Sequence, residues 1–534
     1  MAILFNSWLL DATSILVTGF VILYFYITRN FNYWEKRGVR SVRPKPFLGS
    51  ISSILLLRES IGCWLARNYR ETVGEKFFGA YFVDKPALVV RDLELVKNIF
   101  VKDAHAFLDR NFSAREDVDP LFTKNLFGLK GKKWRHLRVK LSPTFTSGRM
   151  KKMFYLVDEC GKQLASCLQQ SASSGKPVNV KETMARYSTD VISSCAFGVN
   201  TNAQVDPQCE FRAVLKRVFE RESLFDKIAS IMVFILPFFL RLFRLKVIAY
   251  DIEDLVRKMF WDVVEQRRKT GESRNDFMDL MLKIIDEGEV RSEDANDQEE
   301  INKDNSYSLT GFSKAESTDF EMKNDDFVAQ AFVFLLAGFE TSSSVLNYAL
   351  YELALNPDVQ EKLRTEVTST LAASGGKMTY ETVVGMTYLE MVVSETLRKY
   401  PTLSFLERMC LSDYKIPGTK LTIEKGIQVM IPVLGIHSDP EYYPDPTKFD
   451  PERFSAENKS KIPPYAFLPF GEGPRICIGM RFGQMQVKTA LIHVLRSFRV
   501  RACAVTPEPP LTYQPHALTH TPRENIVLTF TKVD

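Results

Sequence analysis

The residues best suited to chemistry lie in a short loop near the C-terminus, which reads Phe470-Gly471-Glu472-Gly473-Pro474-Arg475-Ile476-Cys477-Ile478-Gly479. Two glycines and a proline before the cysteine predict a tight, non-helical turn. The residues after Cys477 have a helical pattern up to about Phe498. The thiol therefore lies where free backbone N–H groups and the helix dipole favour an anion, and a thiolate in that position can bind a metal ion.

The isolation of this cysteine restricts the kind of metal site. No other cysteine or histidine lies near Cys477 in the sequence, and the chain has no CxxC pair, so a tetrahedral zinc site is not expected. A porphyrin supplies four ligands of its own, and one axial thiolate to haem iron therefore fits. The 8 cysteines are too sparse for a disulfide framework, and we interpret the others as ordinary thiols.

With this loop the chain resembles the haem-thiolate cytochrome P450 family over nearly all of its length after the N-terminal segment. The likeness is closest to microsomal insect enzymes that oxidise foreign compounds, and residues 141–148 and 337–343 carry it. The resemblance implies a mainly α-helical fold with small β-sheets, in one large haem domain. It also implies that Cys477 is the proximal ligand of haem b (iron protoporphyrin IX) and that Phe470 belongs to the haem-binding loop.

A second motif contains Phe334, Ala337, Gly338 and Thr341 at helical spacing. Small side chains at Ala337 and Gly338 would let the helix pass close over a flat ring and leave room for dioxygen. The resemblance implies that Glu340 and Thr341 are catalytic, an acid–alcohol pair that passes protons through water to the bound oxygen. A buried core helix with a tolerated glycine would have the same periodicity, so that interpretation stays open.

A third motif is expected to be structural. Glu395 and Arg398 are three residues apart in a helical pattern, so their side chains can meet. Such a pair is usually a surface ion pair of little value, but its apolar neighbours favour burial. The resemblance adds Arg453, and the triad would fix the loop that leads to the ligand cysteine.

Haem also carries two propionate carboxylates, which need partners if they are buried. Trp134 and Arg138 are one helical turn apart and resemble the Trp-x-x-x-Arg pair of the family. Arg475 lies two residues before the ligand cysteine, and Arg408 and Arg110 match further family positions. Each of these residues, taken alone, is more typical of a surface charge.

The regions expected to contact substrate are known only by resemblance. They are rich in phenylalanine and leucine, which favours an apolar pocket for a lipophilic ligand. The same side chains are also ordinary core residues. The regions are Phe112–Phe127, Leu224–Ile235, the helix around Phe334, Leu403–Leu406 and the turn near Leu518.

The N-terminus predicts a membrane anchor. Residues 12–28 carry no charge, and with residues 3–10 the apolar stretch reaches the roughly 20 residues that span a bilayer. Basic residues follow, which places the rest of the chain in the cytosol. A cleaved signal peptide is less well supported, because no basic region precedes the apolar run and no small-residue cleavage site follows it. We expect an anchor at 1–28, a basic, proline-containing spacer at 29–49 and the haem domain at 50–534.

Composition and charge add three constraints. The 534 residues are 45% hydrophobic and 25% charged, which is ordinary globular composition. Residues 291–326 have a net charge of −7 and predict a mobile acidic surface loop within the domain, so the rest of the chain carries +12. The overall charge of +5 gives no reason to expect binding to nucleic acid.

Helical patterns dominate the chain, and the clearest β-type segments are Phe78–Val90 and Gln428–Pro432. The apolar segment 228–243 is too short to span a membrane and is interrupted by Pro237. It predicts either a buried helix or a peripheral contact with the membrane that holds the anchor.

The function implied by the resemblance is a monooxygenase of the endoplasmic reticulum membrane, with its catalytic domain facing the cytosol. It would use O2 and electrons from NADPH, delivered by NADPH-cytochrome P450 reductase, with cytochrome b5 as a second candidate partner. The chain has no convincing nucleotide-binding unit of its own. An acidic reductase could dock on basic residues that flank Trp134 and Cys477, although these could equally form a solvated surface: Lys132, Lys133, Arg135, Lys140, Arg481 and Lys488.

The expected substrates are xenobiotics such as plant toxins and insecticides, which would be hydroxylated or epoxidised. An endogenous lipid or hormone is the alternative substrate. A reductase-independent enzyme that rearranges peroxides is a second alternative, but it would not need Glu340 and Thr341. A membrane-bound haem sensor or carrier is a third, and it would need only Cys477.

Overall fold

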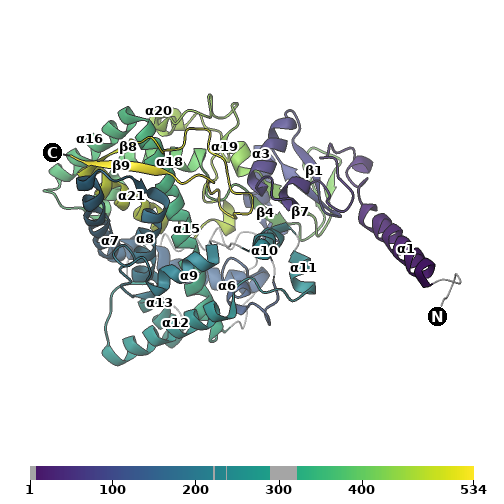
Figure 1. Cartoon of the computed structure of the whole chain (residues 1–534), viewed down its shortest axis with the longest axis horizontal. Helices are drawn as coiled ribbons and strands as arrows, with labels where there is room; N and C mark the ends of the chain where they lie inside the picture. Colours follow the sequence, from purple (N-terminus) through teal and green to yellow (C-terminus); the bar gives the residue numbers. More distant parts are fainter. Residues whose placement is uncertain are drawn as a thin grey trace.

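A long helix, α15 (Asp325–Leu355), forms the centre of the protein. The computed structural model describes residues 8–112, 114–219, 223–235, 237–288, 297 and 321–533. Apolar residues occupy nearly the whole circumference of α15, which is why it is buried and packs against α8, α21, α18, α5 and α12. Figure 1 shows the other helices around it, with the strands at two edges of the body.

The remaining helices are mostly amphipathic and turn one apolar face toward the core. They are α1 (Trp8–Thr28), α2 (Ser52–Leu55), α3 (Ile61–Glu71), α4 (Leu93–Lys97), α5 (Pro120–Thr123), α6 (Gly131–Leu141), α7 (Ser147–Ser174), α8 (Val180–Ile192), α9 (Glu210–Phe219), α10 (Leu224–Ile235), α11 (Pro237–Leu242), α12 (Tyr250–Thr270), α13 (Phe277–Glu287), α16 (Pro357–Ala373), α17 (Tyr380–Gly385), α18 (Thr387–Lys399), α19 (Val433–His437), α20 (Ala456–Lys459) and α21 (Met480–Ser497). Short 3-10 or π turns lie at η1 (Glu35–Arg37), η2 (Asn98–Lys102), η3 (Ala104–Phe107), η4 (Ser142–Phe145), η5 (Ser193–Phe197), η6 (Pro451–Phe454) and η7 (Gly473–Arg475).

The β structure is confined to small sheets. The largest has the strand order β1-β2-β7-β4, in which β2 and β7 are parallel and the other neighbours antiparallel. A second sheet has the order β3-β9-β8, and β5 pairs with β6. The strands are β1 (Phe77–Phe82), β2 (Lys85–Val90), β3 (Val178–Asn179), β4 (Leu406–Met409), β5 (Tyr414–Lys415), β6 (Thr422–Ile423), β7 (Gln428–Ile431), β8 (Phe498–Ala502) and β9 (Val527–Lys532). The predicted fold class, mainly α with small sheets, is confirmed, and both predicted β segments are strands.

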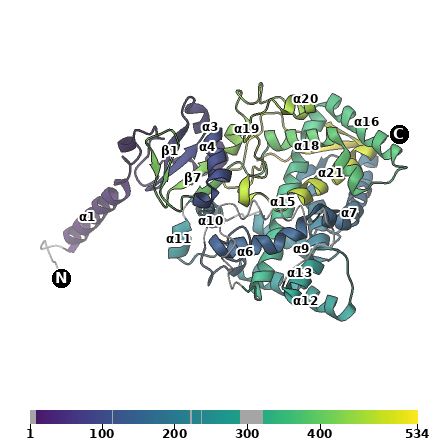
Figure 2. The same ribbon diagram turned by 180° about the vertical axis from the view of Figure 1, so that it is seen from behind.

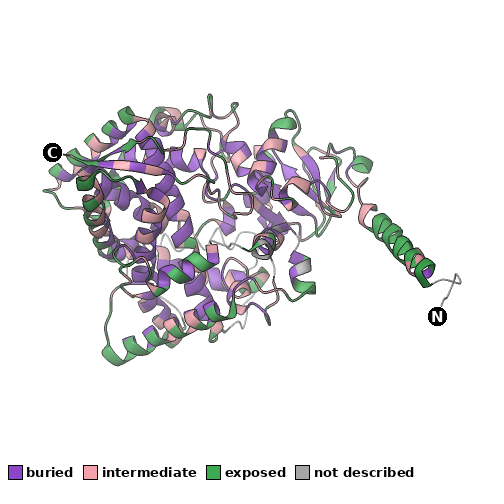
Figure 3. Ribbon diagram, in the orientation of Figure 1, coloured by how far each residue is buried: buried purple, intermediate pink, exposed green. Residues whose placement is uncertain are grey.

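The N-terminal helix α1 projects away from the body (Figure 1, and from behind in Figure 2), and nearly all of it is exposed (Figure 3). Among the described residues, α1 and α15 are the helices long and apolar enough to cross a membrane, by length and composition. They differ in burial, since 6% of the apolar window is buried in α1 and 72% in α15. Helix α15 is therefore a core helix, and α1 is the segment that fits the predicted anchor.

The predicted spacer, residues 29–49, packs on the body. The indole of Trp34 is 1% exposed and donates to the Ala80 carbonyl of β1 at 3.1 Å. Ser41 forms a bridge to Gly79, also in β1. Apolar and bridging residues thus attach this segment to the edge of the first sheet, where the sequence suggested an extended connection.

The predicted acidic loop, residues 291–326, falls largely outside the described residues. At its C-terminal end, Asp325 and Asp326 belong to the first turn of α15, where acidic side chains interact favourably with the positive end of the helix dipole. Asp297 is buried and accepts a hydrogen bond from the Gly148 N–H at 3.0 Å. The segment as predicted therefore includes acidic residues that are not part of a solvated loop.

The residues Glu395, Arg398 and Arg453 meet in the core. The Arg398 guanidinium binds both Glu395 oxygens, at 2.6 and 2.8 Å, and donates to the His437 carbonyl at 2.9 Å. Arg453 Nε lies 3.4 Å from Glu395 Oε1. Glu395 is 0% exposed and Arg398 is 1% exposed, and this buried pair of α18 is connected to η6 through Arg453 and to α19 through the His437 carbonyl.

Replacing Glu395 with alanine would leave two buried guanidinium groups without their carboxylate. We expect the free energy of unfolding to fall by about 3–5 kcal/mol, which chemical denaturation would measure. A matched control is Glu265→Ala, which removes an exposed i,i+4 partner of Lys269 and should leave stability unchanged. Equal stability of the two variants would contradict a structural role for the triad.

Candidate active site

A cavity of about 310 Å³ lies between helix α15 and the loop that precedes α21. Cys477 opens onto it from the loop, and Ala337, Gly338 and Thr341 open onto it from α15. The other candidate cofactor-binding residues also line it: Arg110, Trp134, Arg138, Arg408, Phe470 and Arg475. The fold thus collects around one cavity residues that are more than 350 positions apart in the sequence.

The loop that carries the thiol depends on glycine. Gly473 has φ +71, and a Cβ atom there would lie 1.8 Å from the Phe100 carbonyl oxygen. The Cys477 N–H donates to the Phe470 carbonyl at 3.0 Å, which closes the turn. Helix α21 begins three residues later, at Met480, so the predicted order of loop, cysteine and helix is present.

The ionisation of the thiol is a balance of opposing effects. Burial raises the pKa of Cys477, while the Gly479 N–H and the charges of Arg138 and Arg110 lower it by smaller amounts. The sequence predicted only the effects that favour an anion. The net direction is upward, and a cation bound at the thiol would favour the thiolate.

Four arginines line the same cavity, of which Arg138, Arg408 and Arg475 are buried and Arg110 is half-buried. Burial and mutual repulsion lower the pKa of Arg110 to about 10 and that of Arg408 to about 9, and they lower that of Arg475 as well. Arg138 donates to the Ile476 carbonyl at 2.9 Å. Such a concentration of buried positive charge calls for an anionic partner, and the two propionates of haem meet that requirement.

Arg475 is the most constrained of the four. Its guanidinium stacks over Trp134, 4.0 Å from the ring centroid, and donates to the carbonyls of Leu108 and Leu129 at 3.1 and 2.7 Å. It also lies 3.4 Å from Asp109 Oδ1. Many of its donors are thus used within the chain, so Arg475 supplies charge and holds the cavity wall more than it offers free N–H groups.

The donor set fits haem better than a free metal ion. Among the described residues, no group of three or more His, Cys, Asp or Glu side chains could hold a metal ion. A single thiol, small residues on the facing helix and a cluster of cations are what an iron porphyrin with two propionates needs.

The small residues of α15 have two explanations, which are close packing against α8 and a position on the cavity. A Cβ atom at Gly338 would lie 2.6 Å from Ile192 Cδ1 at the end of α8, so a larger residue there would force the Ile192 side chain to move. The Thr341 hydroxyl donates to the Ala337 carbonyl at 2.6 Å and faces the cavity. The burial and packing of α15 support the core-helix interpretation, and the position of Ala337, Gly338 and Thr341 on the cavity is compatible with ring binding, which stays a prediction.

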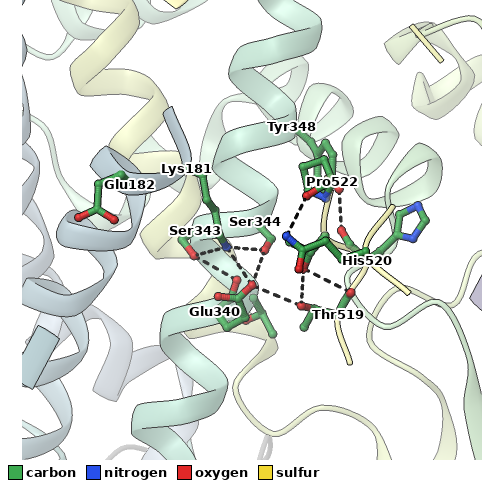
Figure 4. Close-up of polar contacts among 12 residues, drawn as sticks. Lys181, Glu182, Glu340, Ser343, Ser344, Tyr348, Thr519, His520 and Pro522 are labelled. Atoms are coloured by element: carbon green, nitrogen blue, oxygen red, sulfur yellow. Dashed lines mark hydrogen bonds and ion pairs between the residues drawn. The ribbon is translucent and has the colours of Figure 1, made fainter. Parts of the chain in front are cut away.

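Glu340 is not among the residues that line the cavity, and its carboxylate lies among Lys181, Ser344 and Thr519 (Figure 4). Its carboxylate accepts from Lys181 Nζ of α8 at 2.9 Å, Ser344 Oγ at 3.2 Å and Thr519 Oγ1 at 3.3 Å. Lys181 also donates to Ser343 Oγ at 3.1 Å. Neighbouring residues on a helix point about 100° apart, so the structure separates Glu340 from the Thr341 hydroxyl that the sequence placed beside it.

The predicted substrate regions contribute unequally to the cavity. Leu126, Phe127, Phe334, Leu403 and Leu406 line it, whereas the described side chains of Leu224–Ile235 and Leu518 do not. Further apolar residues line it as well, among them Phe145, Ile192 and Phe277.

Three polar residues of this region were missed in the sequence: Asp109, Lys181 and Glu407. Their partners are distant in the chain, so no local spacing indicates them. For Glu407 a signal existed, because it alternates with Leu406 and Arg408 in a strand and must face the opposite side of the sheet.

The steric requirement at Gly473 gives a direct test of the loop. Gly473→Ala should lower the free energy of unfolding by about 3 kcal/mol or more, because the methyl group meets the Phe100 carbonyl at a positive φ. The control is Gly376→Ala, with φ +79 and open space around it, which should cost about 1 kcal/mol. Chemical denaturation measures both, and a Gly473 variant as stable as the control would contradict the loop geometry.

Comparisons with known proteins agree with this geometry. The family model described as Cytochrome P450 matches residues 40–529. Cytochrome P450 6j1 of Blattella germanica is 44% identical over 502 residues, covering 94% of both chains. Cytochrome P450 6k1 of the same species is 45% identical over 503 residues, covering 94% of this chain and 93% of its own. Cytochrome P450 6a2 of Drosophila melanogaster is 40% identical over 503 residues, covering 93% of this chain and 94% of its own.

A match over most of the chain, with relatives well above 30% identity, leaves no ambiguity about the family. The thiol loop, the buried arginines and the small residues of α15 all lie within the matched residues. The chain therefore belongs to the cytochrome P450 family of haem-dependent monooxygenases.

Proposed function

We propose that this monooxygenase inserts one oxygen atom of O2 into lipophilic foreign compounds, with electrons delivered from NADPH by a separate reductase. The observation that carries the proposal is the single cavity in which Cys477 and the buried arginines face Ala337, Gly338 and Thr341. The insect relatives support a role in xenobiotic metabolism. An endogenous lipid or hormone remains the alternative substrate.

The residues in the cavity wall have distinct roles in this proposal. Cys477 would be the axial ligand of the haem iron, and Phe470 would lie beside the bound ring. Arg110, Arg138 and Arg408, with Trp134, would bind the propionates. The bound haem supplies the redox chemistry that activates O2.

Protons would reach the site through residues of this chain. The Thr341 hydroxyl faces the cavity and donates to the Ala337 carbonyl, and it would hold a water molecule there. Glu340 would hold the next proton, and Lys181, whose side chain is 24% exposed, would connect that carboxylate to solvent. For the acid–alcohol pair to work, the Glu340 carboxylate must leave Lys181 and approach the hydroxyl through water.

The cavity wall favours lipophilic substrates. Phe127, Phe145, Phe277 and Phe334 contribute aromatic surface, and leucines at 126, 403 and 406 contribute aliphatic surface. Polar groups are few outside the arginine cluster, so binding would be driven by burial of apolar area more than by directed hydrogen bonds. This is consistent with a broad range of foreign compounds.

Docking of the reductase, with cytochrome b5 as a second electron donor, is proposed on the basic face around α6. Lys132 and Lys133 are exposed there. Lys488, which the sequence added to this face, is unsuitable, because it is 4% exposed and its ammonium lies 2.6 Å from Glu390. The docking surface would therefore be smaller than the sequence suggested.

The membrane location follows from α1 together with a second apolar surface. Ile231 and Ile235 of α10 are buried against the first sheet, whereas Phe238, Leu242 and Phe243 are 53%, 57% and 62% exposed. We propose that these exposed residues contact the endoplasmic reticulum membrane while the catalytic domain faces the cytosol. Segment 228–243 thus combines the two alternatives that the sequence left open.

The function is tested by co-expression with a reductase. The protein should consume NADPH and oxidise members of a lipophilic panel, with products identified by mass spectrometry, and the reduced carbon-monoxide complex should have the red-shifted spectrum of thiolate-ligated haem. Cys477→Ala should lose both. Turnover without reductase in the presence of lipid hydroperoxide would instead support peroxide rearrangement.

Thr341→Ala tests the proton path. Without the hydroxyl, the product formed per NADPH consumed should fall about 10-fold, with hydrogen peroxide released instead, because proton delivery becomes unguided. Ser342→Ala is the control, since its neighbouring hydroxyl is also on α15 and is not proposed to carry protons. Unchanged coupling in the Thr341 variant would rule out this assignment.

A further inference from the structure

A buried carboxylate lies behind the cavity wall, and none of the functions above uses it. Glu407 is 4% exposed and lies in β4 between Leu406 and Arg408, which both line the cavity. Because successive side chains of a strand point to opposite faces, Glu407 lies behind the wall that they form. A buried acid in such a position costs free energy unless it is paired.

Hydrogen bonds attach the segment of Arg110 to strand β4, and the Glu407 carboxylate makes one of these attachments. Both of its oxygens accept the Asn111 N–H, at 3.1 and 2.8 Å, which fixes the segment that carries Arg110. The same segment is attached to β4 by the Met409 N–H, which donates to the Asp109 carbonyl at 2.8 Å. One carboxylate thus joins the strand of Arg408 to the segment of Arg110.

The charges around Glu407 favour its ionised form. Burial raises the pKa of Glu407 above its usual value, and the Asn111 N–H and the cations Arg110, Arg408 and Lys130 lower it by smaller amounts. In return, its charge raises the pKa of both arginines against their burial and mutual repulsion. Another acid of this region, Asp109, is engaged with Arg475 and with the Gly131 N–H at 2.8 Å.

The arginines themselves are oriented for a ligand on the cavity side. Arg110 stacks over Phe127 and donates to its carbonyl at 3.0 Å. Arg408 stacks over Phe100, 4.6 Å from the ring centroid, and donates to the Glu407 carbonyl at 2.8 Å. Glu407 balances their charge from behind, so their remaining N–H groups can serve an anion in front.

From this arrangement we propose that Glu407 is the positioning residue for Arg110 and Arg408, and that it sets both the retention of haem and the charge its propionates meet. This inference rests on the proposed binding of haem in the cavity. Without the carboxylate, two adjacent guanidinium groups would repel each other and the Arg110 segment would lose one of its attachments. The propionate site would loosen and become more positive.

The test uses full-length, haem-loaded protein and the variant Glu407→Gln, which keeps the volume and an acceptor for Asn111 but removes the charge. We expect haem to transfer to apomyoglobin about 10-fold faster than from the wild type, as is typical when an outer partner of a metal site is lost. The ferric–ferrous midpoint potential should become more positive, because added positive charge favours the reduced haem. The thiolate spectrum of the carbon-monoxide complex should remain.

A matched control is Glu366→Gln. The Glu366 carboxylate also accepts two backbone N–H groups, from Tyr388 at 2.8 Å and Leu389 at 2.9 Å, but it does not line the cavity. This variant should retain the wild-type transfer rate and potential. If Glu407→Gln also retains both, the proposed role of Glu407 is wrong.

Two further outcomes are distinguishable. If Glu407→Gln does not fold, Glu407→Asp keeps the charge but shortens the reach to Asn111, and it should lose haem faster at an unchanged potential. A wild-type rate of haem loss in that variant would overturn the proposal. If the wild-type protein itself lacks the thiolate spectrum, the proposed function fails, and the failure lies with Cys477 and not with Glu407.

Discussion

The burial of positive charge around one thiol is the constraint on which the rest of this structure depends. Arg110, Arg138, Arg408 and Arg475 line the wall of one cavity, and burial lowers the pKa of Arg110, Arg408 and Arg475. Such a wall is stable only with fixed acids behind it and an anion in front of it. The acids are Glu407 and Asp109, and the anion is the role left for the haem propionates.

The same principle recurs away from the cavity. Glu395 is held between Arg398 and Arg453, and Glu340 is held by Lys181. Each of these two carboxylates connects elements that are separate in the chain. Glu395 connects α18 to η6 on the approach to Cys477, and Glu340 holds α15 against α8. Buried ion pairs of this kind contribute little net stability, but breaking one is costly, which makes them effective at specifying a single arrangement.

Helix α15 combines the demands of packing and chemistry. Its length and apolar composition would suit a membrane, yet 72% of its apolar window is buried in the core. Gly338 permits the close approach of Ile192, and the same absence of a side chain leaves space in the cavity. A residue required by packing thus also serves the site, and periodicity alone could not separate the two roles.

The sequence by itself determined the local features. The glycine-rich turn before Cys477, the one-turn spacing of Trp134 and Arg138, the apolar N-terminal helix and the mainly helical fold follow from neighbouring residues, because backbone conformation and helical faces are set over a few positions. Only the tertiary structure decided that Glu407 accepts the Asn111 N–H, that Glu340 turns toward Lys181 and that Lys488 is buried beside Glu390. These contacts join residues from about 100 to about 300 positions apart, and the free energy of a buried charge depends on surroundings that no local pattern records.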